Sequence, residues 1–356
     1  MMDKEYIISG IQQIGIGVTN VVEGRKWYGN LFGMDITMFD DDSIAGLMLP
    51  YTGGQEQKRR AILALNIQGG GGFEVWQYTG RTPQPYEGDI KLGDLGILIT
   101  KMKTRDVQAL YEQFNRAGVT VLGDISTDPV GRQHFYVVDL YGNLFELVEW
   151  DDWFSNNNNL CGGPVGCVIG VSNIERALVV YQDILGYDEV IYDQLAPSFD
   201  DFEPIPGGDS KCRRVLLKHS RPRKGSFSEL LGSSEIELVH TPGRRIRKIY
   251  ENRFWGDPGF IHLCFDINNM DALRKYCESR GHPFTVDSSN SFEMGEAAGH
   301  FSYIEDPDGT LIEFVETHKI PVIKKLNWYL NLRKRNPEKP LPRWMLKSLR
   351  FNKKTY

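Results

Sequence analysis

The stretch "EDPDGTLIEFVE", residues 305–316, contains the pattern that decides the fold. Its first residues, Asp-Pro-Asp-Gly at 306–309, are typical of a tight turn, and the alternation that follows predicts a strand. Glu313 stands where that strand should carry a buried apolar side chain. A second stretch, "VDLYGNLFELVEW" at residues 138–150, places Glu146 exactly 167 positions before Glu313. The recurrence indicates that the chain contains a structural repeat.

A second repeat relates the two halves of the chain. The segment "IGIGVTNVVEGRKWYGNLFGM" from Ile14 and the segment "CVIGVSNIERALVVYQDILGY" from Cys167 share identical residues at an offset of 153 positions. The strands "RRAILAL" from Arg59 and "RRVLLKH" from Arg213 also correspond, and strand alternation predicts that one arginine of each pair faces inward. We therefore expect four related units. They begin near Gln13, Asp94, Gly166 and His262, and each should contain a strand, a helix and three further strands.

These units predict an α+β fold in which four βαβββ modules pair into two tandem domains. The first domain should span residues 1–151 and the second residues 164–318. Residues 152–163, with a run of four asparagines, should form the linker between them. A basic helical tail, residues 319–356, should follow.

The motifs "YxxxLG" after the first helix of a unit and "DPDGxxxE" before its last strand resemble those of the vicinal oxygen chelate superfamily. This superfamily includes glyoxalase I, extradiol dioxygenases and bleomycin resistance proteins. The resemblance implies that paired sheets form a cup around a divalent metal, held by a residue on each first strand and by a glutamate on each last strand. The physical argument agrees, because an ionised carboxylate facing the hollow of a sheet needs a cation opposite it. The glutamates in question are Glu74, Glu146, Glu237 and Glu313.

The first-strand positions differ between the units. His262 and Gln13 occupy this position in the fourth and first units, whereas Gly166 in the third has no side chain to bind a metal. In the second unit, counting from the strand start selects Asp94, and counting back from the end of the helix selects Ile99. The resemblance then implies a C-terminal cup with Glu237, His262 and Glu313, and an N-terminal cup with Gln13, Glu74 and Glu146.

The C-terminal set resembles the Gln, Glu, His and Glu ligands of glyoxalase I without the glutamine. It predicts a lyase, isomerase or epimerase that transfers a proton next to a carbonyl group of a small oxygen-rich substrate. Glu313 or Glu237 would act as the base, with His300 as a further acid or base, and the metal would be Zn, Ni, Fe, Mn or Mg. An extradiol-type or hydroxyphenylpyruvate-type dioxygenase and a metal-free binding protein remain open alternatives.

The composition is that of a globular protein, with 41% hydrophobic and 25% charged residues among 356. No run reaches the roughly 18 to 20 apolar residues of a membrane span, and no secretory signal begins the sequence. The five cysteines form no CxxC pair. We therefore expect a cytoplasmic protein with buried thiols.

The charge is unevenly distributed. The tail contains twelve Lys and Arg residues against one acid, Glu338, although the whole chain has a net charge of −6. Amphipathic helices are expected around Ile323, Leu326 and Leu330 and again around Trp344. This tail could pack on the acidic body, bind a partner or lie on an anionic membrane, and no nucleic-acid motif accompanies it. A homodimer is also compatible with four units.

Overall fold

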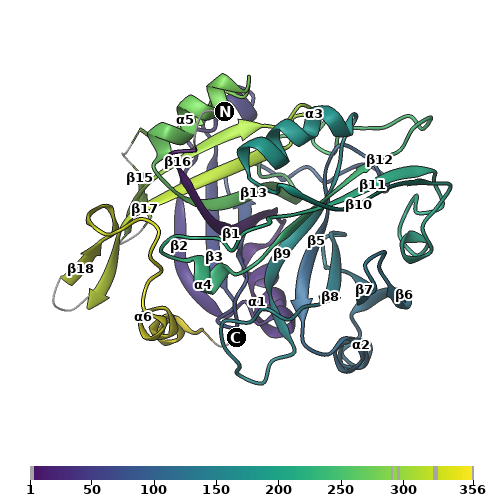
Figure 1. Ribbon diagram of the computed structural model, residues 1–356, viewed down its shortest axis with the longest axis horizontal. Coiled ribbons are helices and arrows are strands. Elements are labelled where there is room, and N and C mark those ends of the chain that lie inside the picture. Colours follow the sequence, from purple (N-terminus) through teal and green to yellow (C-terminus); the bar gives the residue numbers. More distant parts are fainter. Residues whose placement is uncertain (1–3, 290–291, 295–296, 324–327, 355–356) are drawn as a thin grey trace.

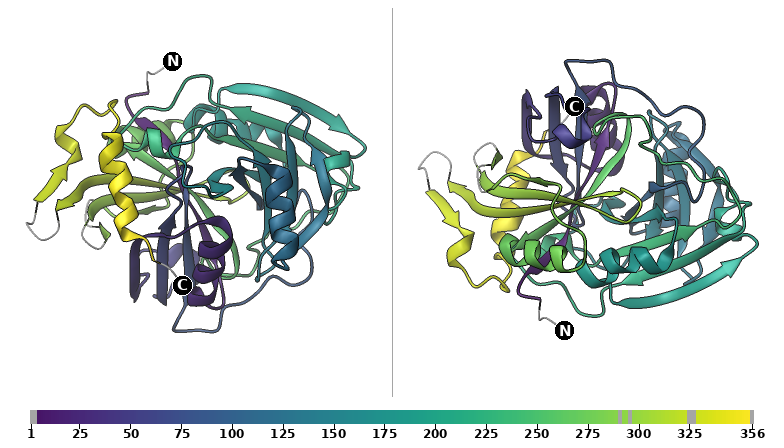
Figure 2. Two further views of the ribbon diagram at one scale, coloured as in Figure 1. Left: turned by 90° about the horizontal axis from the view of Figure 1, so that it is seen from below. Right: turned by 90° about the horizontal axis from the view of Figure 1, so that it is seen from above.

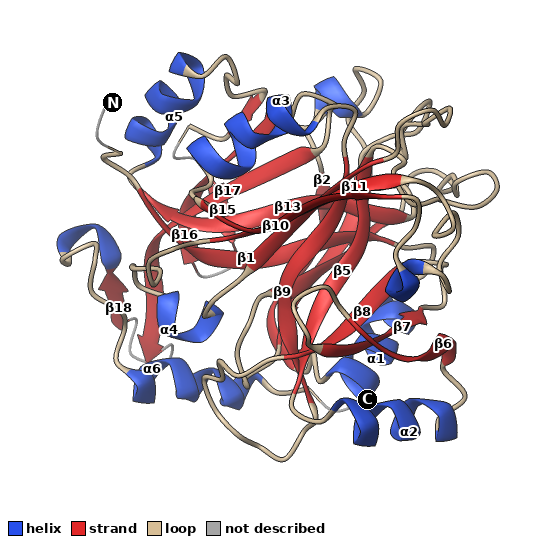
Figure 3. Ribbon diagram, turned by 45° about the vertical axis from the view of Figure 1, so that its right-hand side comes forward, coloured by secondary structure: helices blue, strands red, loops and turns tan. Residues whose placement is uncertain are grey.

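The computed structural model describes residues 4–289, 292–294, 297–323 and 328–354. Two twisted sheets occupy the middle of the molecule, and the helices lie around them (Figures 1 and 3). Each unit has the predicted order of strand, helix and further strands, so the α+β fold with four βαβββ modules is confirmed. Within the described residues, no helix is long and apolar enough to cross a membrane.

The first sheet combines the first and fourth units. Its main path runs β14-β16-β17-β13-β1-β4-β3-β2, with β15 beside β16 and β18 beside β17. The two units join where β1 pairs antiparallel with β13. The strands are β1 (Ile7–Gly17), β2 (Ile36–Ile44), β3 (Lys58–Leu65), β4 (Gly72–Tyr78), β13 (Gly259–Asn268), β14 (Val286–Asp287), β15 (Phe292–Met294), β16 (Ala297–Glu305), β17 (Leu311–Ile323) and β18 (Trp328–Asn331).

The second sheet combines the second and third units in the order β10-β11-β12-β9-β5-β8-β7-β6. The two units join where β5 pairs antiparallel with β9. The strands are β5 (Gly96–Thr104), β6 (Thr120–Thr127), β7 (Gln133–Val138), β8 (Leu144–Glu149), β9 (Cys161–Gly170), β10 (Glu189–Ala196), β11 (Cys212–Lys218) and β12 (Glu235–His240).

This pairing corrects the expected grouping of the cups. We expected consecutive units to share a cup, but the first unit shares its sheet with the fourth, and the second with the third. The physical reason is that each unit leaves its first strand as an unpaired edge, which any other first strand can complete. Each sheet takes one unit from either side of the predicted domain boundaries at residues 151 and 164. The boundaries themselves stay a prediction.

A short polar side chain caps the helix of every unit. The helices are α1 (Val21–Phe32), α2 (Val107–Arg116), α3 (Ile174–Leu178), which continues as a π-helix over Val179–Ile184, and α5 (Met270–Ser279). Asn20, Asp106, Asn173 and Asn269 accept hydrogen bonds from the first backbone N–H groups of these helices. Such caps stabilise a helix start by about 1 kcal/mol. The helix therefore begins at the same place in all four units.

Buried hydrogen bonds between consecutive units explain two of the repeated motif residues. The Tyr28 hydroxyl donates to Asp139 at 2.6 Å, and the Tyr181 hydroxyl donates to Asp306 at 2.9 Å. Asp306 also accepts hydrogen bonds from backbone N–H groups of its own turn, including that of Asp308. The tyrosine of one unit thus joins the turn of the next, within one continuous hydrophobic core.

The tail is less helical than predicted. The helix expected around residues 323–330 is wrong where it can be described, because β17 continues through Ile323 and pairs with β18, which contains Leu330. Leu326 lies outside the described residues. Beyond β18, short helical turns include α6 (Arg343–Lys347) and the 3₁₀-helix Ser348–Asn352. In the views of Figure 2, α6 lies beside the strands of the first unit.

Apolar side chains fix the tail to the body. Leu341 and Leu346 belong to a buried cluster that includes Ile36, Leu63 and Phe154. At the end of the tail, the Lys353 ammonium lies 2.8 Å from the Asp35 carboxylate. The end of the tail is therefore packed on the body, in part against the first unit.

Candidate metal centre

Four adjacent strands of the first sheet each contribute one polar side chain to a single point. These are Glu74 on β4, Gln13 on β1, His262 on β13 and Glu313 on β17. His262 Nε2 lies 3.1 Å from Glu313 Oε2 and 3.5 Å from Glu74 Oε2. Gln13 Nε2 lies 3.0 Å from the same oxygen of Glu74 and 3.3 Å from that of Glu313.

The backbone around His262 is shaped to accept its ring. Gly15 lies opposite His262 in the ladder, and the register then shifts so that Ile16 lies opposite Phe260. A Cβ atom at Gly15 would stand 2.4 Å from the imidazole, so glycine leaves the space that the ring occupies. The Trp255 ring lies parallel to the imidazole at 6.3 Å, and the Tyr303 ring lies edge-on to it at 5.6 Å. His262 is completely buried in this setting.

The four side chains fit a divalent metal ion. Neighbouring ligands bound at about 2.0 to 2.2 Å are about 2.8 to 3.6 Å from one another in octahedral or tetrahedral geometry. The distances from His262 Nε2 and Gln13 Nε2 to the two carboxylates fall in this range. Both His262 ring nitrogens and Gln13 Oε1 are buried without a hydrogen-bond partner. A rotation of the Gln13 amide would present this oxygen in place of the nitrogen. Buried polar atoms without partners are costly, and a cation bound at this point would satisfy His262 Nε2 and Gln13 Oε1.

The electrostatics of this centre also favour a cation. Burial, followed by the charge of Glu313, raises the pKa of Glu74 to about 7. Burial alone would lower the pKa of His262, but the nearby carboxylates outweigh it and raise this pKa. No ion pair joins Glu74 or Glu313 to a lysine or arginine among the residues that the structure describes. The guanidinium of Arg59, on the same face, is paired with Asp41.

The wall of the centre is aromatic. Trp76, Tyr78, Trp255 and Tyr303 belong to one buried cluster around it. The side chains of Glu74 and Glu313 are 13% and 8% exposed, so both reach solvent, whereas His262 does not. A pocket of about 430 Å³ has Trp255 in its lining, together with Tyr51 and Phe254. Trp255 therefore separates this pocket from His262, whose ring lies parallel to it.

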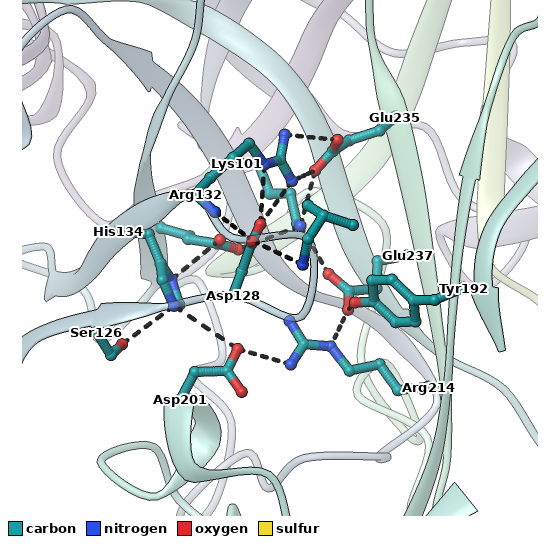
Figure 4. Close-up of polar contacts among 12 residues, drawn as sticks. Lys101, Ser126, Asp128, Arg132, His134, Tyr192, Asp201, Arg214, Glu235 and Glu237 are labelled. Carbon is teal, nitrogen blue, oxygen red and sulfur yellow. Dashed lines mark hydrogen bonds and ion pairs between the residues drawn. The ribbon is translucent and has the colours of Figure 1, made fainter. Parts of the chain in front are cut away.

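The second sheet places a different cluster at the equivalent point (Figure 4). Lys101 Nζ lies 2.6 Å from Glu237, 2.9 Å from Glu235 and 3.5 Å from Glu146. Arg214 also donates to Glu237. Burial alone would raise the pKa of Glu235, but Lys101 and other cations lower it to about 2, and the pKa of Glu237 is lowered in the same way. These carboxylates are already neutralised by the chain itself.

Comparison with known proteins agrees with this architecture. The sequence profile of the Glyoxalase/Bleomycin resistance protein/Dioxygenase superfamily matches residues 10–147 and 164–314. The chain belongs to this superfamily. Among solved structures, a glyoxalase I mutant from Zea mays is 15% identical with a TM-score of 0.58, covering 88% of this chain and 94% of that one. A putative dioxygenase from Bacillus subtilis subsp. subtilis str. 168 is 14% identical with a TM-score of 0.56, covering 87% and 86%. At these identities the structures show a shared fold alone. No curated protein matches the sequence.

Membership in the superfamily does not by itself say which candidate ligands share a cup. The structure brings them together in a different combination from the one we expected. Glu237 does not join His262 and Glu313, and Gln13 and Glu74 do not join Glu146. Instead, the centre takes two residues from each expected set. Glu146 lies in the second sheet, where its carboxylate is 3.1 Å from His134 Nδ1.

His300 does not reach the centre. Its Nε2 atom lies 2.5 Å from Asp287 Oδ1. Ser302, on the same face of β16, donates to Met270 of α5, so this face lies against the helix. Tyr303 on the opposite face is the residue that lies beside His262. The structure therefore does not bring His300 together with the four residues of this centre, and its acid or base role stays a prediction.

The second unit confirms the count from the helix. Cys264 pairs with Glu313 and Lys101 pairs with Glu146, an offset of 163 positions that makes Ile99 the equivalent of His262. Asp94 is buried elsewhere, bonded to Arg244 at 2.8 Å. The second unit therefore lacks a first-strand ligand.

One inward arginine was predicted for each pair, and the ladders show which one it is. Arg59 lies opposite Tyr78, on the cup face, whereas Arg214 is the fully buried member in the third unit. Arg60 and Arg213 are equivalent, because each forms a two-pronged bond to an aspartate twenty positions earlier. The structural correspondence of these two strands thus differs by one residue from the sequence match. Arg213 corresponds to Arg60, and Arg214 corresponds to Ala61.

Proposed function

We propose that the protein is a metal-dependent enzyme that transfers a proton at a carbon next to a carbonyl group. The observation that carries this proposal is the convergence of Gln13, Glu74, His262 and Glu313 at one point. These are the four ligand types of glyoxalase I, including the glutamine that the expected C-terminal set lacked. The pairing of the first and fourth units supplies it.

The chemistry needs a cation and a base. A divalent ion at this centre would polarise the substrate oxygens and stabilise an enediolate. We assign the base to Glu74, whose side chain is more exposed than that of Glu313 and whose Oε2 atom lies farther from His262. Its carboxylate would accept the proton from one carbon and return it to the next. Glu313 and His262 would remain fixed as ligands.

The surrounding residues support this reaction. The aromatic rings of Trp76, Trp255 and Tyr303 limit the access of water to the reacting atoms. The Gln13 side chain contacts both carboxylates and would hold them in place. Among the described residues the centre has one histidine, whereas a dioxygenase of the extradiol type would use two. The residue set therefore favours proton transfer over oxygen chemistry.

The test is exchange of the α-protons of an α-hydroxycarbonyl compound, hydroxyacetone, with D₂O, followed by NMR. Protein loaded with Ni, Zn or Mn should catalyse exchange, Glu74→Gln should abolish it while keeping the metal, and His262→Ala should lose both. His300→Ala is the control and should retain exchange. Consumption of oxygen with a catechol and no proton exchange would overturn the proposal.

A further inference from the structure

The second sheet contains a buried ammonium where the first has its metal centre. The Lys101 side chain is 1% exposed, and its three carboxylate partners, Glu146, Glu235 and Glu237, are fully buried. A buried ammonium group is tolerated only when carboxylates neutralise it, and buried carboxylates likewise need a cation beside them. Burial alone would lower the pKa of Lys101, but the three glutamates raise it, so the group stays charged.

The ladders make the two sites equivalent position by position. Glu237 lies opposite Val168 and Glu74 lies opposite Gly15, which differ by the repeat offset of 153. Gly166 likewise corresponds to Gln13. Lys101 corresponds to Cys264. The second site therefore keeps both glutamates, lacks the glutamine and the histidine of the first site, and has the ammonium group of Lys101 in addition.

Other side chains fill the rest of the second cup. The buried Arg214 guanidinium stands where the first cup has Ala61, and it lies 3.8 Å over the Phe202 ring. That ring and Asp201 come from the segment between β10 and β11, and Asp201 bonds Arg214 at 2.6 Å. The second cup is thus closed by its own chain.

We propose that Lys101 is the resident cation of the second cup and takes the place of a metal ion there, so that the chain binds one catalytic metal, not two. The cluster then serves as an ionic joint between the second and third units. Lys101 and Arg132 come from the second unit, and their partners Glu235 and Glu237 come from the third. A corollary is that the second cup is a latent metal site, which removal of the ammonium should open.

The test uses full-length protein in the His262→Ala background, so that any bound ion belongs to the second cup. Metal content is measured after dialysis against Mn²⁺ or Zn²⁺, together with the melting temperature with and without the ion. Lys101→Ala should gain about one equivalent of metal and a metal-dependent rise in melting temperature. Lys103→Ala, which removes an ammonium bonded to the Asp152 carbonyl outside the cup, is the control and should gain neither.

A second pair of variants covers the case in which Lys101→Ala does not fold. Lys101→Met alone should lower the melting temperature. Adding Glu146→Gln should recover part of the loss, because Glu146 would otherwise have no lysine or arginine partner among the described residues. The inference is overturned if the His262→Ala protein with Lys101 intact already binds an ion in the second cup. It is also overturned if Lys101→Ala gains no metal, or if Lys101→Met and Glu146→Gln lower the melting temperature additively. Loss of proton-exchange activity would bear on the proposed function alone.

A different observation concerns the end of the tail. Trp344 and Phe351 are 65% and 79% exposed, although apolar neighbours such as Leu346 are buried against the body. They are seven residues apart, about two helical turns, and the exposed cations Lys347 and Arg350 lie between them in sequence. Exposed aromatic rings interleaved with cations suit the interface of an anionic bilayer.

We also propose that this surface of the tail binds anionic membranes. The test is co-sedimentation with vesicles of equal parts phosphatidylglycerol and phosphatidylcholine, which should pellet the wild type. The double variant Trp344→Ala and Phe351→Ala should stay in the supernatant. The exposed leucines Leu140 and Leu195 give a matched control, since replacing both by Ala should not change pelleting. Equal pelleting of wild type and tail variant, or equal pelleting with pure phosphatidylcholine, would refute the proposal.

Discussion

Glu74 and Glu237 occupy equivalent positions in the two cups. Replacing each by glutamine should change the stability of the metal-free protein in opposite directions. In the metal-free protein, Glu74 has its pKa raised from 4.5 to about 7, chiefly by burial and by Glu313. The folded state therefore holds this proton more tightly than the unfolded state. Stability contributed by the protonated group is present below about pH 4.5 and is lost as the pH rises through about 7.

The magnitude follows from the size of this change. At about 1.4 kcal/mol per pKa unit, an ionised Glu74 costs the folded metal-free protein about 3 kcal/mol above pH 7. The neutral variant Glu74→Gln should therefore raise the free energy of unfolding by about 3 kcal/mol at about pH 8, and by about 1 kcal/mol or less at about pH 5. With saturating metal this difference should largely disappear, because the bound ion neutralises Glu74 in the wild type and stabilises both proteins.

The assay is urea unfolding with EDTA and with Ni²⁺ or Zn²⁺, at both pH values. Glu237→Gln is the matched control, because Glu237 occupies the same position but is paired with Lys101 and Arg214. Its loss should destabilise the protein by about 3 to 5 kcal/mol whether or not metal is present, as expected for breaking a buried ion pair. If Glu74→Gln destabilises the metal-free protein at pH 8, Glu74 already has a cationic partner and the reasoning is wrong.

Three further substitutions test the parts of the site and of the repeat. His262→Ala should remove the bound metal whereas His300→Ala retains it, as measured by elemental analysis; equal retention would exclude His262 as a ligand. Gly15→Ala should displace the imidazole of His262, because the new methyl group would stand 2.4 Å from it. We expect the free energy of unfolding in urea to fall by about 1 to 3 kcal/mol and metal binding to weaken. An unchanged metal affinity would contradict this. Tyr28→Phe should cost about 1 to 3 kcal/mol by leaving the buried carboxylate of Asp139 one donor short, and a neutral effect would show that the repeated tyrosine does not join the units.

The sequence was sufficient to predict the four units and the inward glutamates, because both depend on local pattern. The alternation around Glu313 and the turn at residues 306–309 are properties of a few neighbouring residues. Strand period and turn chemistry act over that same short range. The prediction of β17 and of the carboxylate on its cup face therefore did not need the tertiary structure.

The grouping of the ligands could not be predicted in this way. It depends on β1 pairing with β13 rather than with β5, a contact between residues about 250 positions apart. Each unit exposes a similar edge, so the sequence of one unit does not select its partner. The cations of the second cup were missed for another reason. Lys101 and Lys103 lie on either side of Met102 in the strand "GILITKMKT", and lysines within a strand of this kind are the sequence signal for a buried ion pair.

The contacts between units form a closed ring, and this explains why the metal centre lies where it does. Tyr28 joins the first unit to the second, and Tyr181 joins the third to the fourth. The ionic cluster around Lys101 joins the second to the third. The remaining joint, between the fourth unit and the first, is the one that carries the candidate metal ligands. Two of those ligands, Gln13 and Glu74, precede the asparagine-rich segment and the other two follow it, so neither half of the chain contains a complete centre. The proposed metal centre is therefore complete only when the ring is closed, and the Lys101 cluster lies at the opposite joint.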